Sequence, residues 1–173
     1  MALNKIVSGG QAGVDRGALD AALVAGFSCG GWCPSDRRAE DGEIPERYPL
    51  TPLPDGAEIS LRGEAVSAAR RAGEQNRART LKNVQDSDGT VILFSGTLSG
   101  GTLLTQKLCA RERKPLITLD AQAMTKLRAA DAILRFVEEN ELKVLNVAGP
   151  RLSGWPQGYS FALRVIGAVI SNG

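Results

Sequence analysis

Three glycine-rich segments of the sequence could bind a phosphate through their backbone. They span residues 8–13 (SGGQAG), 95–102 (SGTLSGGT) and 148–151 (AGPR), and each follows an apolar run typical of a strand and precedes a helical pattern. In such turns the backbone N–H groups can face a phosphate, and the N-terminus of the next helix adds a favourable dipole. This spacing predicts a site for an anionic ligand such as a nucleotide.

The side chains within these segments favour the same chemistry. Ser99 and Thr102 can donate hydroxyl hydrogen bonds, and Arg151 offers a guanidinium whose geometry matches phosphate. No segment is a Walker loop, because no Gly-Lys-Ser/Thr follows, and none reads G-x-G-x-x-G. Each segment alone also fits a tight strand-to-helix turn without any ligand, whereas the three together favour a binding site.

Histidine is absent from the sequence and cysteine is scarce. The first absence excludes every mechanism that uses a Ser-His or Cys-His pair. The three cysteines, Cys29, Cys33 and Cys109, are too few for a four-thiolate zinc site or a disulfide framework. The C-x-x-x-C spacing of the first two favours free thiols over a redox pair.

The order of the predicted elements defines the fold class. Strand patterns and helical patterns alternate, which is typical of an α/β protein: strands at 4–10, 27–34, 89–96, 114–120 and 143–149, helices at 14–26, 57–84, 100–113, 124–142 and 159–171. We therefore expect a Rossmann-like three-layer sandwich with a mostly parallel sheet of about five strands. The length of 173 residues fits one domain, 1–173. In such folds the three glycine-rich segments meet at the carboxyl edge of the sheet, where ligands bind.

The net charge and the apolar runs limit the kinds of binding partner that we expect. The net charge is only +2, which predicts no binding to nucleic acid or to an anionic membrane. The apolar run at 161–170 is too short to span a bilayer. No signal-peptide pattern opens the sequence, so we expect a cytoplasmic protein.

The proline-rich and charged segment 34–57 is predicted to be a long loop, which in a compact domain is usually functional or mobile. On it, Asp41 can contact a ribose or a metal-bound water, or it can serve only as a turn residue. Arg37 and Arg38 can hold a phosphate or face solvent.

Several further charged and aromatic residues are expected to have structural roles only. Asp86 and Asp88 precede the 89–96 strand and are expected in a turn at the opposite edge of the sheet, beyond reach of the ligand. Trp155, between Gly154 and Pro156, is expected to be exposed. The charge run that includes Arg62, Arg70 and Arg71 is expected to be a solvated helix face.

Four stretches of the sequence resemble one family. They are SGGQAGVDRGALDAAL (8–23), GGWCPSDRRAEDGEIPERYPL (30–50), RTLKNVQDSDGTVILF (79–94) with GGTLLT (100–105), and KVLNVAGPR (143–151). The chain resembles the "putative molybdenum (cofactor) carrier" family, a Rossmann-like branch of the SLOG superfamily that is described as a circularly permuted relative of its YpsA group. The second stretch is long and unusual, which makes the resemblance specific.

The resemblance implies a set of ligand-binding residues. These are Gly9, Gly10, Gln11, Gly13, Asp15 and Arg16 in the first segment, Gly100, Gly101, Thr102 and Thr105 in the second, and Gly149, Pro150 and Arg151 in the third. Ala12 departs from the family pattern, which has threonine there, so one phosphate contact is expected to be lost. Cys33 is a further candidate contact. The resemblance also implies a homo-oligomer, a dimer or a tetramer.

The expected function is the binding of an anionic nucleotide-like ligand, molybdenum cofactor or an adenine nucleotide (ATP or AMP), by a molybdenum cofactor carrier. One alternative is a slow Mg²⁺-dependent nucleotide hydrolase, since acidic residues can hold Mg²⁺ through water and phosphate. Another is a nucleotide-sensing interaction protein without catalysis. The superfamily also contains phosphoribohydrolases, whose signature resembles P-G-G-x-G-T-x-x-E. This activity is disfavoured here, because Thr105 stands where the glutamate of that signature would fall.

Overall fold

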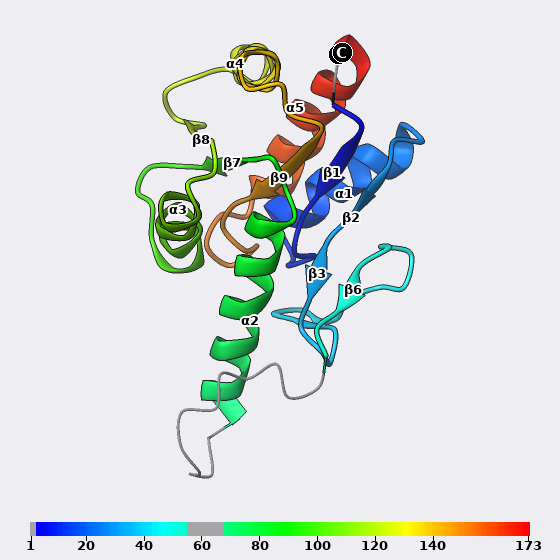
Figure 1. The fold of residues 1–173 in the computed structure, drawn as a ribbon, viewed down its shortest axis with the longest axis vertical. Coiled ribbons are helices and arrows are strands. Elements are labelled where there is room, and N and C mark those ends of the chain that lie inside the picture. The colour runs from blue at the N-terminus through cyan, green and yellow to red at the C-terminus, as the bar shows by residue number, and fades with distance from the viewer. Residues whose placement is uncertain (1–2, 55–67) are drawn as a thin grey trace.

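The computed structural model of the protein describes residues 3–54 and 68–173. Its central sheet is all-parallel and contains five strands in the order β2-β1-β9-β7-β8, as Figure 1 shows. These strands are β1 (Lys5–Val7), β2 (Cys29–Gly30), β7 (Gly89–Phe94), β8 (Leu116–Asp120) and β9 (Val144–Ala148). The predicted Rossmann-like α/β fold is confirmed.

The helices cover both faces of this sheet. They are α1 (Val14–Val24), α2 (Ala68–Gln85), α3 (Gly100–Glu112), α4 (Lys126–Glu139) and α5 (Gly158–Asn172). The chain crosses from β1 to β2 in one direction and from β7 to β8 in the other, and because such crossovers are right-handed, α1 and α3 lie on opposite faces. Helix α5 packs between α1 and α4 on one face, and α2 packs on α3 on the other.

The two faces are packed very differently. The main apolar core lies between the sheet and α1, α4 and α5, where Val14, Ile133 and Ile166 are fully buried. Among the residues that the structure describes, the buried cluster between α2 and α3 consists of Val84, Leu108 and Cys109, with a few half-buried neighbours. The α2–α3 face therefore has little apolar packing near the carboxyl edge of the sheet.

The segment between β2 and α2 is more ordered than the sequence indicated. The single strand predicted at 27–34 is interrupted at Gly31, so that β3 (Trp32–Cys33) leaves the main sheet and pairs with β6 (Thr51–Pro52). The predicted loop contains an antiparallel hairpin of β4 (Arg38–Ala39) and β5 (Gly42–Glu43). The loop predicted over 34–57 therefore contains three two-residue strands within its described part, 34–54. Residues 55–57 of that loop and residues 57–67 of the predicted helix lie outside the described residues.

Arg37 explains why this segment is ordered. Its guanidinium donates hydrogen bonds to the carbonyls of Leu50 (3.0 Å), Pro45 (3.2 Å) and Tyr48 (3.3 Å). A planar group with several donors can satisfy all three carbonyls at once. Arg37 thus acts as a structural centre of the segment, a role that neither of the two interpretations given to it from the sequence had foreseen.

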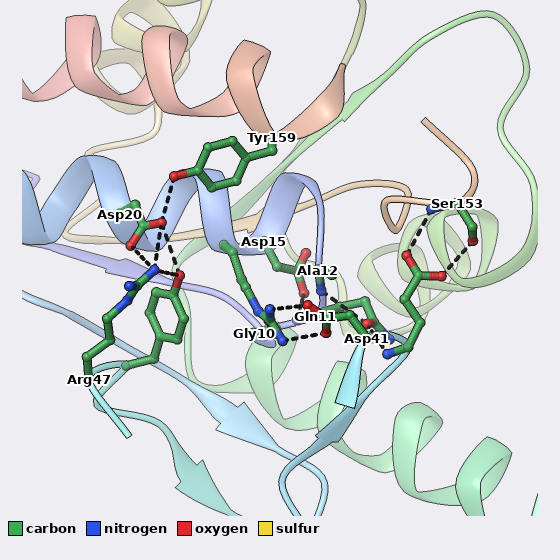
Figure 2. Close-up of polar contacts among 12 residues, drawn as sticks. Gly10, Gln11, Ala12, Asp15, Asp20, Asp41, Arg47, Ser153 and Tyr159 are labelled. Atoms are coloured by element: carbon green, nitrogen blue, oxygen red, sulfur yellow. Dashed lines mark hydrogen bonds and ion pairs between the residues drawn. The ribbon is translucent and has the colours of Figure 1, made fainter. Parts of the chain in front are cut away.

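Asp20 fastens the same segment to the helical layer. Its carboxylate accepts a hydrogen bond from the hydroxyl of Tyr159 on α5 (2.8 Å), as Figure 2 shows, and another from the hydroxyl of Tyr48 (3.0 Å). Burial and this neighbouring carboxylate raise the pKa of Tyr159 to about 12. Both phenols therefore stay protonated donors at neutral pH.

The fold places Trp155 differently from the sequence-based expectation and Asp88 as expected. Trp155 is buried against Phe161 with 5.4 Å between the ring centroids, so the prediction that it is exposed is wrong. A Gly-Trp-Pro sequence suggests a surface turn, but its turn folds the indole back onto the main core. Asp88 lies at the amino edge as predicted, where its carboxylate accepts hydrogen bonds from the N–H groups of Lys143 and Val144.

In the described ranges, no helix is long and apolar enough to cross a membrane.

Candidate functional site

The three glycine-rich segments meet at the carboxyl edge of the sheet. Strands β1, β9 and β7 are adjacent, so the segments that leave them lie side by side. The first and third are directly bonded: the N–H of Leu152 donates to the carbonyl of Ala12 (2.8 Å), and the N–H of Val14 donates to the carbonyl of Pro150 (3.4 Å). The sequence-based expectation that these segments share one place is met.

A cleft of about 670 Å³ opens where the segments meet, bounded on its far side by α2. This volume is within the usual range for a small-molecule site. Eleven of the fifteen residues predicted for the ligand site line it: Gly9, Gln11, Asp15, Ser99, Gly100, Gly101, Thr102, Thr105, Gly149, Pro150 and Arg151.

Gly10, Gly13, Arg16 and Asp41 do not line this cleft. A side chain at Gly10 would collide with Leu50, and one at Gly13 would meet the backbone of Leu152 and Pro150, so both glycines serve the packing of the first segment. Arg16 forms a bidentate pair with Asp41, with N–O distances of 2.6 and 2.9 Å. A direct role of these residues toward a ligand stays a prediction.

Helix α2 supplies a wall of the cleft that the sequence analysis missed. Asn76, Arg79, Thr80 and Asn83 line the cleft, and they follow one another at i, i+3, i+4 and i+7. This spacing puts them on one face of a helix. A polar stripe on a helix that must pack against a sheet was the signal that could have identified them.

Asp15 and Arg79 form a buried ion pair at the floor of the cleft. Nη1 of Arg79 lies 3.1 Å from Oδ2 of Asp15, and the side chains are only 13% and 8% exposed. Burial raises the pKa of Asp15, while the guanidinium of Arg79 and the N–H of Gln11 oppose that shift. Nε of Arg79 is buried without a hydrogen-bond partner among the described residues, which leaves donor capacity beside the cleft.

The second glycine-rich segment is open toward the cleft. A Cβ at Gly100 or Gly101 would meet no atom within 4 Å. Gly100 and Gly101 begin the first turn of α3, and their N–H groups have no intrahelical partners, whereas the N–H of Thr102 already donates to the carbonyl of Ser99 (3.1 Å). Ser99 is the N-cap of α3, yet its side chain makes no capping hydrogen bond. Backbone and hydroxyl donors are thus both available at this point.

The charges around the cleft favour an anion. Among the described residues, Arg77, Arg79 and Arg151 line it together with one carboxylate, that of Asp15, which is already paired with Arg79. The carboxylate of Glu40, which does not line the cleft, lies 3.6 Å from Nε of Arg151. The Arg151 side chain is itself strongly exposed. The cleft is therefore electropositive, with one arginine near its floor and two near its rim.

Thiols and metal-binding clusters contribute nothing to this cleft. Cys33 is fully buried among Leu19, Ile44 and Tyr48 and does not line it, and burial raises the pKa of its thiol. Within the described ranges, no three Cys, Asp or Glu side chains are grouped so that they could hold a metal ion. Ala12 is buried and also lies away from the lining.

The tip of the β4–β5 hairpin closes one side of the site. The carboxylate of Glu40 accepts hydrogen bonds from the hydroxyl (2.6 Å) and the N–H (2.9 Å) of Ser153, and the N–H of Glu40 donates to Oε1 of Gln11 (2.8 Å). Figure 2 shows Gln11, Asp41 and Ser153 together at this junction. The hairpin thus connects the first and third glycine-rich segments by polar contacts.

These features define a class of protein, a parallel α/β domain with an electropositive cleft at the carboxyl edge of its sheet. Residues 6–170 match the circularly permuted YpsA SLOG family. The chain belongs to this family.

One solved structure is similar over nearly the whole length. It is a crystal structure at 1.45 Å resolution of a protein from Syntrophus aciditrophicus SB, named "putative molybdenum carrier protein". The two chains are 35% identical and align over 98% of this chain and 96% of the other, with a TM-score of 0.82. No curated protein matches the chain.

Proposed function

We propose that the cleft binds an anionic nucleotide-like ligand through its phosphate, and that the protein acts as a molybdenum cofactor carrier. An adenine nucleotide and the molybdenum cofactor are the two candidate ligands. The name of the similar Syntrophus protein supports the carrier role. The observation that carries the proposal is the open first turn of α3, with Gly100 and Gly101, facing a cleft lined by three arginines.

The arrangement accounts for how a phosphate would be held. The N–H groups of Gly100 and Gly101 point from a helix N-terminus, where negative charge is favoured. The Ser99 hydroxyl lies beside them, and Arg79 contributes a guanidinium from the opposite wall. Because Asp15 fixes Nη1 of Arg79, the remaining donors are held in place before the ligand arrives, which lowers the entropy lost on binding.

The cleft fits the phosphate end of the molybdenum cofactor better than its metal end. The pterin of this cofactor carries a phosphate, for which the donors above are suited. The described lining contains no cysteine, and its one carboxylate is engaged by Arg79, so neither a thiolate nor a free carboxylate is available there to a molybdenum atom. A carrier that holds its cargo by the phosphate leaves the metal centre available to the acceptor protein.

The same donor set disfavours the Mg²⁺-dependent hydrolase. Mg²⁺ sites usually use one or two free carboxylates together with the substrate phosphates. Asp15 is paired with Arg79, and Asp41 is paired with Arg16 outside the cleft. Binding without turnover is therefore the function that we propose.

A thermal-shift panel at fixed protein concentration tests the proposal. ATP, ADP, AMP, a cyclic dinucleotide and molybdenum cofactor are each added with and without Mg²⁺. A ligand that binds only the folded state at 100 times its Kd stabilises by about 2.7 kcal/mol, which gives a clear rise in Tm. Gly101→Val is expected to abolish the rise, because its side chain enters the space in front of the α3 N-terminus.

The matched control is Gly167→Val on α5. A Cβ at Gly167 also meets no atom within 4 Å, but this residue does not line the cleft. It is expected to keep the ligand-induced shift. If none of the ligands raises the Tm of the wild type, or if both variants respond like the wild type, the proposed site is wrong.

The homo-oligomer and the cytoplasmic location implied earlier are part of this proposal. Light scattering coupled to gel filtration is expected to show a dimer or a tetramer. A monomer at micromolar concentration would contradict that part without affecting the cleft.

A further inference from the structure

A second cavity adjoins the cleft. It has a volume of about 750 Å³ and lies between the β4–β5 hairpin and the N-terminal half of α2. Gln11, Asn76 and Arg151 line both cavities. The two spaces therefore form one groove that runs from the open end of α3 past Arg151 to the hairpin.

The three shared residues retain hydrogen-bonding capacity at the junction. Oε1 of Gln11 accepts from the N–H groups of Ala12 (3.1 Å) and Glu40 (2.8 Å), which leaves its amide NH₂ group as a donor. Asn76 donates to the carbonyl of Ala72 (2.9 Å), which leaves its side-chain oxygen as an acceptor. The Arg151 side chain is 64% exposed, and its Nε lies 3.6 Å from the carboxylate of Glu40. A ligand passing through the junction finds both donors and an acceptor.

The charge of the second cavity differs from that of the first. Arg38, Arg71 and Arg151 line it together with Asp36 and Glu40, so two carboxylates offset most of the positive charge there. One oxygen of Asp36 accepts the N–H of Arg38 (3.0 Å), and the other makes no hydrogen bond within residues 3–54 and 68–173. A mixed set of carboxylates and guanidiniums suits a neutral, hydroxyl-rich group better than a second phosphate.

We propose that the ligand is a dinucleotide, in which two nucleosides are joined through a phosphate chain. This inference rests on the proposed phosphate site and names the class of ligand that fills the whole groove. The phosphates lie in the electropositive cleft and at Arg151, and the second nucleoside lies in the second cavity. Each cavity alone has the volume of an ordinary small-molecule site, so a mononucleotide leaves the second one empty.

The groups in the second cavity match the parts of a nucleoside. A carboxylate such as that of Asp36 accepts hydrogen bonds from ribose hydroxyls, as acidic residues do in other dinucleotide sites. The guanidiniums of Arg38 and Arg71 are planar and can stack on a base. Neither arginine forms an ion pair among the described residues, so both are available for this contact.

Isothermal titration calorimetry with phosphate-matched pairs tests the inference. NAD⁺ has the same number of phosphates as ADP, and diadenosine triphosphate has the same number as ATP, so each pair differs by one nucleoside. We expect the member with two nucleosides to bind about tenfold more tightly, or about 1.4 kcal/mol. Arg71→Gln and Arg38→Gln are each expected to remove most of this gain and to leave the affinity for ADP unchanged.

Arg135→Gln is the matched control, because Arg135 is an exposed arginine on α4 and lines neither cavity. This variant is expected to leave the difference in affinity within each ligand pair unchanged. If ADP and NAD⁺ bind equally, or if Arg71→Gln weakens both to the same extent, the dinucleotide inference is wrong and the phosphate site stands. If neither adenine pair binds, the inference fails as well, and a rise in Tm with molybdenum cofactor then decides whether the proposed function survives.

Discussion

Two of the glycine-rich segments look alike in sequence and differ in what surrounds them. In residues 8–13 the glycines are packed: a side chain at Gly9 would collide with Arg79, one at Gly10 with Leu50, and one at Gly13 with the backbone of Leu152. At the second segment, a Cβ at Gly100 or Gly101 would face open space. The first segment therefore organises the protein, and the second presents its backbone to the cleft.

The hydrogen bonds of the two segments differ in the same way. In the first, the N–H of Gln11 donates to Asp15 (3.2 Å) and that of Ala12 to the side chain of Gln11 (3.1 Å), so these donors are already used. In the second, Ser99 occupies the N-cap position of α3, but its side chain accepts no hydrogen bond from the backbone of the helix. Glycine content alone thus does not identify a phosphate site; the environment of each missing Cβ does.

Exchanging glycine for valine in the two segments gives the largest expected difference. Gly13 has φ +111°, and its Cβ would lie 2.8 Å from the backbone N of Leu152. Backbone strain and overpacking together predict that Gly13→Val lowers the free energy of unfolding by about 4 kcal/mol. Gly101→Val is expected to change it by less than about 0.5 kcal/mol, since valine forms helix no worse than glycine. Urea denaturation of both variants measures this, and equal losses would contradict the contrast.

Removing Arg79 tests the buried pair that supports the first segment. Arg79→Met leaves the Asp15 carboxylate buried and unpaired, and we expect a loss of about 3 kcal/mol at pH 7. Arg77→Met is the matched control, because Arg77 is an exposed arginine of α2 that also lines the cleft. It is expected to change the free energy of unfolding by less than about 0.5 kcal/mol.

The pH dependence of the Arg79→Met loss follows from Asp15. Its pKa is raised in the folded protein, so this carboxyl stabilises the fold below its unfolded value of 3.8 and loses that contribution as the pH rises through the folded pKa. Without Arg79 the pKa of Asp15 in the folded protein rises further, so the variant loses more of its free energy of unfolding as the pH rises. The difference between the variant and the wild type should therefore be larger at pH 7 than near pH 4. A constant difference would show that Asp15 is not the partner that matters.

Two N-cap residues provide a smaller test of the second segment. Thr125 caps α4 by accepting the N–H of Arg128 (3.3 Å), whereas Ser99 makes no such bond. Thr125→Ala is therefore expected to lower the free energy of unfolding by about 1 kcal/mol, and Ser99→Ala to leave it nearly unchanged. Ser99→Ala should instead reduce the ligand-induced rise in Tm. If it destabilises the free protein as much as Thr125→Ala, its hydroxyl is not held in reserve for a ligand.

The smallest effect is expected at the hairpin that borders the first segment. Asp41 is 41% exposed, so its pair with Arg16 is screened by solvent, and Asp41→Asn should lower the free energy of unfolding by only about 0.5 kcal/mol, less in 1 M salt. Glu43→Gln on the same hairpin is the control and should have no effect. If Asp41→Asn also abolishes ligand binding, Asp41 contacts the ligand, as the sequence suggested, and does more than secure the hairpin.

Much of the fold could be predicted because its signals are local. The apolar run of β7 and the glycines that end β1 and β9 indicate parallel strands and the edge at which a ligand would bind. The hairpin at 38–43 could not be predicted, because its order depends on Arg37 reaching three carbonyls between Pro45 and Leu50. Trp155 was misplaced for the same reason: its burial depends on Phe161, one turn into the next helix.

The sequence by itself determined the α/β class, the three glycine-rich segments and the absence of histidine chemistry, since periodicity and residue type are local properties. Only the tertiary structure decided which glycines face a ligand. It also brought Arg79 from α2 onto Asp15, 64 positions earlier in the chain, to form the floor of the cleft. Whether a glycine or an arginine is free or already occupied depends on atoms that are distant in sequence, and folding is what brings those atoms into contact.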